Sequence, residues 1–210
     1  MGRRKCKQKK LGKKPEKKLI LLFVEGRKTE LLYFQKIASK YENTRMIVKH
    51  TNDKMVEENY IYSIQSFIKK QPAIQKKDFS FIGIVFDKDK KEDNTFNKVI
   101  KEMENKGFVP LWSNPCFELW FILHYTQWQG THECNEIITN LDKKVKKDHS
   151  AFYGYDKTKE EILEYFADLI EERTKAIKHA KKLIAGNKLP SNCLPCTVIH
   201  QLFEELDNIE

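Results

Sequence analysis

The sequence predicts an α/β protein in which a mostly parallel, Rossmann-like sheet is flanked by helices and followed by a C-terminal helical appendage. Two continuous apolar runs, 19–25 (LILLFVE) and 79–86 (FSFIGIVF), have the composition of strands buried on both faces. Segments with apolar residues at helical spacing lie between and after these runs. Strands that alternate with helices in this way form βαβ units with right-handed crossovers, which gives a parallel sheet.

The expected elements follow one another through residues 19–126. Gly26 ends the first strand, and Thr29 is a suitable N-cap for a helix that runs to about Lys40. Asn114 is expected to cap a later helix, with Pro115 at its first position. The remaining expected elements are a strand at 46–50, a helix from about 55 to 70, a strand at 79–86, a helix at 95–106, a strand at 108–112 and a helix at 115–125.

The C-terminal third of the chain has a different pattern of apolar residues. A polar connection at 127–131 is followed by one long amphipathic helix from about Ile162 to Ile184 and by a short helix near 198–206. No further apolar strand is expected. The chain therefore divides into a basic tail at 1–18, a core at 19–126 and a mainly helical region at 127–210, which we expect to read a substrate or dock a partner.

The charge of the chain favours a polyanionic partner. Its 39 Lys and Arg residues outnumber 30 Asp and Glu residues, for a formal charge of +9. Ten of the basic residues lie within the first 18 residues, against the single acid Glu16. This segment is either an accessory phosphate-binding arm or a solvated tail.

The composition favours a cytoplasmic protein. No apolar run approaches the ~20 residues of a membrane span, and the basic N-terminus leads into a strand rather than a signal peptide. Cysteines are few, so we expect reduced thiols. Cys193 and Cys196 form a CxxC half-site that leaves zinc open as an alternative to free thiols. The five cysteines are Cys6, Cys116, Cys134, Cys193 and Cys196.

Acidic residues follow both apolar runs. Asp87 and Asp89 come directly after the second run, and residues i and i+2 of an extended segment point to the same side. Both carboxylates can then face one Mg²⁺, which prefers hard oxygen ligands. Glu25 ends the first run, and parallel strands open onto one edge of the sheet. We expect these three carboxylates to converge on a cation; the alternative is solvated acids that cap strand ends.

Three ordered blocks carry a resemblance to a known family. A Glu-Gly pair after the first strand and an Asp-x-Asp after a later one resemble the Toprim domain. More fully, the chain resembles the RloB-like (AbiLii-related) Toprim proteins of bacterial defence loci. The blocks are VEGRKTE at 24–30, FDKDK at 86–90 and SNPCFELWFILHY at 113–125, of which the last is the most discriminating.

The resemblance implies roles for the acids. Glu25 would act as general acid or base near the scissile phosphate, and Asp87 and Asp89, with Glu25, would bind Mg²⁺ or Mn²⁺. Glu118 occupies the acid of the third block and is expected to join the catalytic residues. His124, from the same block, is either a catalytic residue or a histidine at the edge of the core.

Phosphate ligands are expected beside these acids. Arg27 and Lys28 follow Glu25 closely, and an arginine can bind phosphate oxygens through two parallel hydrogen bonds. Asn114 either contacts phosphate with the helix start behind it or only caps that helix. The generic Toprim pattern often has an aspartate where this chain reads Thr29-Glu30.

For function, the resemblance implies a Mg²⁺-dependent endonuclease of an antiphage, abortive-infection system under the control of a partner ATPase of the RloA-like AAA or ABC type. RNA such as tRNA is favoured over DNA because no element suited to reading a DNA groove is evident in the sequence. A DNA endonuclease and a non-catalytic nucleic-acid-binding module remain alternatives.

Overall fold

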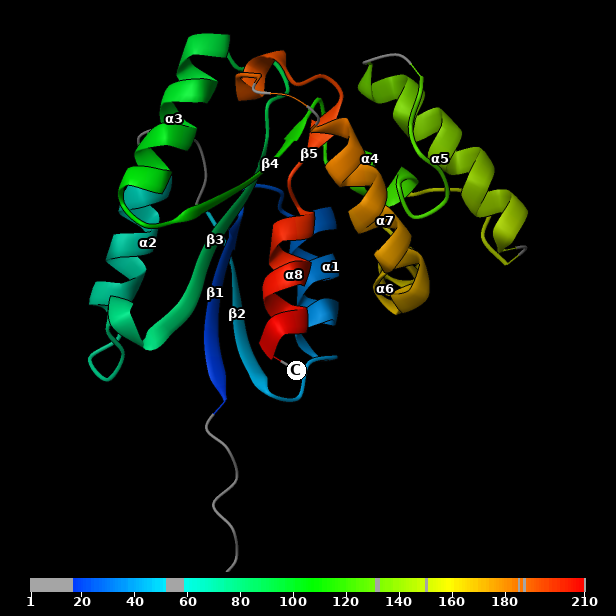
Figure 1. The fold of residues 1–210 in the computed structure, drawn as a ribbon. Coiled ribbons are helices and arrows are strands. Elements are labelled where there is room, and N and C mark those ends of the chain that lie inside the picture. The colour runs from blue at the N-terminus through cyan, green and yellow to red at the C-terminus, as the bar shows by residue number, and fades with distance from the viewer. Residues whose placement is uncertain are drawn as a thin grey trace, which may run out of the picture.

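A single sheet with the strand order β2–β1–β3–β4–β5 organises the computed structural model of the chain (Figure 1). The structure describes residues 17–51, 59–130, 133–149, 151–184, 186 and 188–209. Most of the basic tail expected at 1–18 lies outside the described residues, as does the start of the helix expected from about residue 55.

The two apolar runs form the centre of the sheet. β1 (Lys18–Val24) and β3 (Phe79–Asp87) pair in parallel with each other. β2 (Thr44–His50) flanks β1, and β4 (Val109–Asn114) flanks β3, both in parallel. The prediction of an α/β fold with a mostly parallel sheet is confirmed.

The short strand β5 (Cys196–Thr197) corrects the expectation that no strand follows residue 126. It pairs antiparallel to the end of β4, with Thr197 opposite Ser113 and their hydroxyl oxygens 2.9 Å apart. A strand of two residues has no apolar period, so only its pairing partner reveals it.

Helices cover both faces of the sheet (Figure 1). On one face lie α2 (Asn59–Lys69) and α3 (Asp93–Asn105). On the other face lie α1 (Thr29–Ala38), α4 (Glu118–Ile122), α6 (Glu160–Asp168), α7 (Ile170–Leu183) and α8 (His200–Ile209), with α5 (Cys134–Asp148) outermost. Two short 3-10 helices are η1 (Lys76–Asp78) and η2 (Pro190–Asn192).

The alternation of side chains along β1 gives each face its own core. Ile20, Leu22 and Val24 point into the core shared with α1, α4 and the C-terminal helices, whereas Leu21 and Phe23 point into the core under α2 and α3. All five side chains are buried, as expected of a strand covered on both faces.

The C-terminal helices differ from the prediction in two ways. The long helix expected from Ile162 to Ile184 is broken at Leu169, whose backbone angles (φ −73°, ψ 65°) are not helical, so that α6 and α7 run separately. Helix α5 was not predicted. Its buried residues Ile137, Leu141 and Val145 form a narrow stripe in an otherwise polar segment, which is a weak helical signal.

The region after residue 126 shares the core of the region before it. The ring of Phe203 on α8 stacks on Trp120 at a centroid distance of 5.2 Å, and the ring of Phe166 on α6 stacks on Phe121 at 4.2 Å. Helix α8 lies beside α1 (Figure 1). The appendage expected from the sequence is therefore built into the cores of the fold, and its residues Cys193, Cys196 and Val198 reach the core under α2 and α3 as well.

Candidate active site

The strand order places a topological switch point between β1 and β3. From β1 the chain passes through α1 to β2 on one side, whereas β3 and β4 lie on the other side. Sites in open parallel sheets form where the order reverses in this way, beyond the carboxyl ends of the strands. Glu25 follows β1, and its backbone N–H donates to the Val85 carbonyl (2.9 Å) two residues before Asp87.

A cleft of about 570 Å³ opens at this edge, and we call it the acidic cleft. Its lining includes carboxyl groups from the ends of both central strands, from the start of α1 and from α4. The acids are Glu25, Glu30, Asp87, Asp89 and Glu118. The lining cations are Arg27, Lys28, Lys91 and Lys157.

Glu25 is held by three groups. The Tyr60 hydroxyl donates to its Oε1 (2.7 Å), the Lys91 ammonium lies 3.0 and 3.1 Å from its two oxygens, and the backbone N–H of Asp87 donates to Oε2 (3.3 Å). The same ammonium donates to the Asp87 carbonyl (2.7 Å). Lys91 therefore joins the ends of β1 and β3 and offsets the charge of Glu25.

The Asp87 carboxyl differs from that of Glu25 in having little compensation. Burial raises its pKa well above the usual range, and the nearby carboxylates of Glu30, Glu118 and Glu25 add to the effect, while a backbone hydrogen bond from Phe117 opposes it. Its Oδ1 is buried and has no hydrogen-bond partner in the structure. An acceptor in this state is suited to a cation, because a buried polar atom without a partner is otherwise costly.

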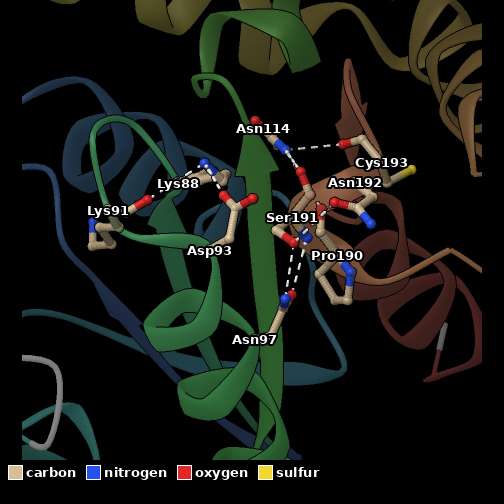
Figure 2. Close-up of polar contacts among 9 residues, drawn as sticks. All are labelled: Lys88, Lys91, Asp93, Asn97, Asn114, Pro190, Ser191, Asn192 and Cys193. Carbon is tan, nitrogen blue, oxygen red and sulfur yellow. Dashed lines mark hydrogen bonds and ion pairs between the residues drawn. The ribbon is translucent and has the colours of Figure 1, made fainter.

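Asp89 reaches the cleft through an uncommon backbone conformation. Its φ of 42° lies in the left-handed region, where aspartate is among the better tolerated residues. Two hydrogen bonds hold the loop, from the Lys88 N–H to the Ser113 carbonyl (2.8 Å) and from the Asp89 N–H to the Pro115 carbonyl (3.2 Å). The Lys88 ammonium also pairs with Asp93 (2.8 Å), as Figure 2 shows.

Glu30 belongs to the cleft although the sequence analysis assigned it no role. Burial raises its pKa to about 7, and the carboxylates of Glu118 and Glu25 contribute, whereas a backbone hydrogen bond and Lys157 oppose the shift. Its carboxyl group packs so closely against Gly26 that any side chain at that position would collide with it. The glycine after Glu25 thus makes room for a second acid, which the motif alone does not reveal.

Glu118 is placed by α4 and contacts the C-terminal region. Its side chain is buried, and the Tyr155 hydroxyl donates to its Oε1 (3.3 Å). Burial and the nearby charge of Glu118 raise the pKa of Tyr155 well above its usual range, so that this tyrosine is a neutral donor. Glu118 therefore joins Glu25, Asp87 and Asp89 in one cleft, as the sequence predicts for these four positions.

Cations from two further segments also line the cleft. Arg27 and Lys28 are exposed in the turn before α1, and Lys157 comes from the segment between α5 and α6. The Thr29 hydroxyl donates to the Lys157 carbonyl (3.3 Å), which ties that segment to the start of α1. Lys157 was not predicted because it lies far from the three sequence blocks.

Asn114 and His124 are corrections to the predicted site. Asn114 ends β4 rather than capping a helix, and its buried amide donates to the carbonyls of Ser191 (3.2 Å) and Cys193 (3.0 Å) (Figure 2). His124 is buried beside Trp120, with its Nδ1 3.0 Å from the Trp120 carbonyl, and burial lowers its pKa to about 3. Neither is among the described residues that line the acidic cleft, so both act in packing.

The cysteines also depart from the expectation of reduced thiols. Cys116 is joined to Cys134, and Cys193 is joined to Cys196. The first pair lines the acidic cleft, whereas the sulfurs of the second lie near the Leu183 carbonyl, at 3.6 and 3.3 Å.

The donor set of the cleft fits a hard divalent cation such as Mg²⁺ or Mn²⁺. Carboxylate oxygens arrive from two neighbouring strand ends, and the buried Oδ1 of Asp87 has an unused acceptor position. Asp87 and Asp89 are the residues best placed to bind the ion, because Glu25 is already paired with Lys91.

Comparison with known protein families identifies the family of the chain. A family model described as RloB-like protein matches residues 20–206, which is most of the chain. Comparisons with curated proteins and with solved structures give no match. Among the helices of the described residues, none has both the length and the apolar character needed to cross a membrane.

Proposed function

The chain belongs to the RloB-like family, and from the chemistry of its acidic cleft we propose that it is a metal-dependent endonuclease of antiphage defence. The observation that carries the proposal is that Glu25, Asp87 and Asp89 line one cleft at the switch point of the sheet, with the buried Oδ1 of Asp87 unsatisfied. The neighbouring carboxylates raise the pKa of Asp87, and a bound cation would compensate their negative charge.

Different residues of the cleft would have different roles in phosphodiester cleavage. Asp87 and Asp89 would hold the metal ion, which when bound polarises the phosphate and offsets its developing charge. Lys91 and Tyr60 hold the Glu25 carboxylate in one orientation, and a proton moves to or from Glu25 during cleavage. Arg27, together with Lys28, would bind phosphate oxygens at the mouth of the cleft.

The substrate proposed is RNA such as tRNA, and the proposed regulator is a partner ATPase of the RloA-like AAA or ABC type. Both rest on the family resemblance. The charge of the chain supports a nucleic-acid substrate, since the cations that line the cleft suit a phosphate backbone. Cytoplasmic action remains a prediction from composition.

The test is cleavage of total RNA and of plasmid DNA by the purified chain, each with Mg²⁺ or with EDTA. We expect RNA to be cut in Mg²⁺ only. Glu25→Gln should lower the rate by roughly 10²–10⁴-fold, because a positioned proton-transfer group contributes about that much. Asp87→Asn should also lower the rate, because it removes a charged ligand of the metal ion. Glu161→Gln, an exposed carboxylate on α6 outside the cleft, is the matched control and should cut at the wild-type rate.

Three other outcomes of these experiments would contradict the proposal. Cutting of plasmid alone would make the chain a DNA endonuclease, and cutting that persists in EDTA would exclude the metal mechanism. Binding of nucleic acid without cleavage, with or without the partner ATPase, would make it a binding module.

A further inference from the structure

A second set of metal-ligand groups lies on the wall of the acidic cleft. The sulfurs of Cys116 and Cys134 and a carboxylate oxygen of Glu118 all lie within 4.8 Å of one another. All three residues line the cleft, and Cys116 and Glu118 are buried. No role in the proposed cleavage reaction is assigned to either cysteine.

Packing brings the two sulfurs together independently of the bond between them. Cys116 lies between the end of β4 and the start of α4, and Cys134 is the first residue of α5. Helix α5 buries Ile137, Leu141 and Val145 in the same core as the apolar residues of α4. Reduction of the disulfide would therefore leave two thiols facing each other beside Glu118.

The chemistry of this set differs from that of the Mg²⁺ ligands. Two thiolates and one carboxylate suit Zn²⁺, whereas Mg²⁺ takes oxygen ligands. Zn²⁺ with Zn–S bonds of about 2.3 Å places two thiolates about 3.8 Å apart in a tetrahedral site. That separation is within the 4.8 Å span of the present ligand atoms, so a small movement of the side chains suffices.

The other cysteine pair provides an internal contrast. Cys193 and Cys196 are also joined, but their sulfurs lie beside a backbone carbonyl. Among the described residues, the set at Cys116, Glu118 and Cys134 is the group of three His, Cys, Asp or Glu residues whose ligand atoms all lie within 4.8 Å of one another. A CxxC spacing thus marks the less suitable pair, and the suitable pair is 18 residues apart.

We propose that Cys116, Cys134 and Glu118 form a thiol-dependent Zn²⁺ site that opens onto the acidic cleft. A dithiol reductant converts the disulfide to two thiols and is itself oxidised to a cyclic disulfide. One Zn²⁺ then replaces the two thiol protons, which pass to water. Three protein ligands leave a fourth position of the tetrahedron for water from the cleft.

The test is Co²⁺ and Zn²⁺ binding by the full chain without nucleic acid. Protein reduced with dithiothreitol, then freed of reductant and metal, is titrated with Co²⁺ in excess Mg²⁺. We expect one equivalent to give a thiolate-to-Co²⁺ absorption band, and Zn²⁺ to displace it. Protein kept oxidised should show no band.

Variants identify the ligands. Cys116→Ser and Cys134→Ser should each weaken Zn²⁺ binding at least about 100-fold in competition with a chromophoric chelator, and Glu118→Gln should weaken it by roughly 10–100-fold. The double variant Cys193→Ser, Cys196→Ser is the matched control and should bind as the wild type does. Circular dichroism checks that each variant is folded. If one of the two single cysteine variants does not fold, the other is sufficient to test the site.

Two results would overturn the inference. One is a reduced wild-type chain that takes up no Co²⁺, and the other is loss of the band in the double control variant but not in the Cys134→Ser variant. Because absorbance is measured without substrate, a failure here leaves the proposed nuclease activity untouched, and an inactive nuclease leaves this site untouched.

Discussion

Two neighbouring carboxylates of the acidic cleft differ in how far their negative charge is compensated. Glu25 is paired with Lys91 and accepts a hydrogen bond from Tyr60. Asp87 is buried with one oxygen unsatisfied, next to three other acids. The first arrangement holds a carboxylate in place, and the second favours a proton or a metal ion at the same spot.

The pKa of Glu30 predicts how stability depends on pH without metal. Burial raises this pKa from 4.5 to about 7, so the folded state keeps a proton that the unfolded state releases in that range. Stability from this group is therefore lost as pH rises from 4.5 to about 7, by at most about 1.4 kcal/mol per pH unit. In EDTA, Glu30→Gln should stabilise the fold by roughly 1–3 kcal/mol at pH 8 and by little at pH 5.

Urea unfolding of both chains at the two pH values checks this expectation. Comparing the variant with the wild type cancels the contribution of His124, because both chains contain it. The lowered pKa of His124 makes the fold less stable as the pH falls below 6.5, which is the opposite dependence to that of Glu30. An equal stabilisation at pH 5 and pH 8 would contradict the assigned burial of Glu30. Added Mg²⁺ should reduce the stabilisation that Glu30→Gln gives at pH 8. A bound ion would already compensate the carboxylates whose mutual repulsion the variant lowers.

Lys157 is predicted to contact a substrate phosphate. Its exposed side chain lines the cleft and its charge acts on Glu30. We expect Lys157→Met to lower by about 1 the slope of log affinity against log salt for an RNA oligonucleotide, since one phosphate contact is lost. The measurement is fluorescence anisotropy in a Glu25→Gln background, where cleavage is expected to be absent.

The neighbouring Lys159 provides the control for this prediction. It is exposed but is not among the described residues that line the cleft, so Lys159→Met should leave the salt slope unchanged. Equal effects of the two substitutions would indicate general attraction rather than a contact in the cleft.

The segment between α5 and α6 is an element that the C-terminal region contributes to the cleft. The Asp142 carboxylate on α5 accepts a hydrogen bond from the Tyr155 N–H (3.1 Å). Gly154 precedes this residue with a φ of 133°, a conformation open to glycine almost alone. A fixed backbone here positions both the Tyr155 hydroxyl on Glu118 and the Lys157 side chain.

Gly154→Ala is predicted to disturb this segment. A β-carbon at that position would collide with the Asp142 carboxylate and would also be strained by the positive φ. We expect a loss of stability on the order of 1–3 kcal/mol and weaker RNA binding. Chemical denaturation and anisotropy measure the two effects. Tyr153→Ala, at a neighbouring residue that is 91% exposed, should change neither by much.

The molecule as a whole folds around a core that both halves of the sequence share. Trp120 and Phe121 stack on Phe203 and Phe166, and α8 lies beside α1 (Figure 1). Removing residues 127–210 would expose these faces to water and remove Lys157 from the cleft.

We therefore predict that residues 17–126 do not fold alone, although they contain all three sequence blocks. Circular dichroism and urea unfolding of this fragment should show no cooperative transition. A chain that begins at Lys17 and continues to the end is the control and should unfold cooperatively, since β1 begins at Lys18. A cooperative transition in the fragment would show that the two parts are separate domains.

The central part of this protein could be predicted from its sequence because the signals there are local. The runs at 19–25 and 79–86 are long enough to identify buried strands, and each carries its own acid at its end. Parallel strands open onto one edge of the sheet, so the placement of Glu25, Asp87 and Asp89 along one cleft follows from the order of the elements. The resemblance added Glu118 and the family, and the match to the family model confirms the family.

The remaining assignments depended on contacts between distant parts of the chain. The sequence leaves Asn114 as a phosphate ligand or a helix cap, whereas in the fold its amide donates to the carbonyls of Ser191 and Cys193. The sequence leaves His124 as a catalytic residue or a histidine at the edge of the core, and the packing of α6 against it favours the second. Lys157 lines the cleft, and Tyr155 contacts Glu118, only when the segment between α5 and α6 packs against α1 and α4. Sequence determines the period and the ends of each element, whereas burial, pairing and charge compensation are settled by residues that meet only in the folded chain.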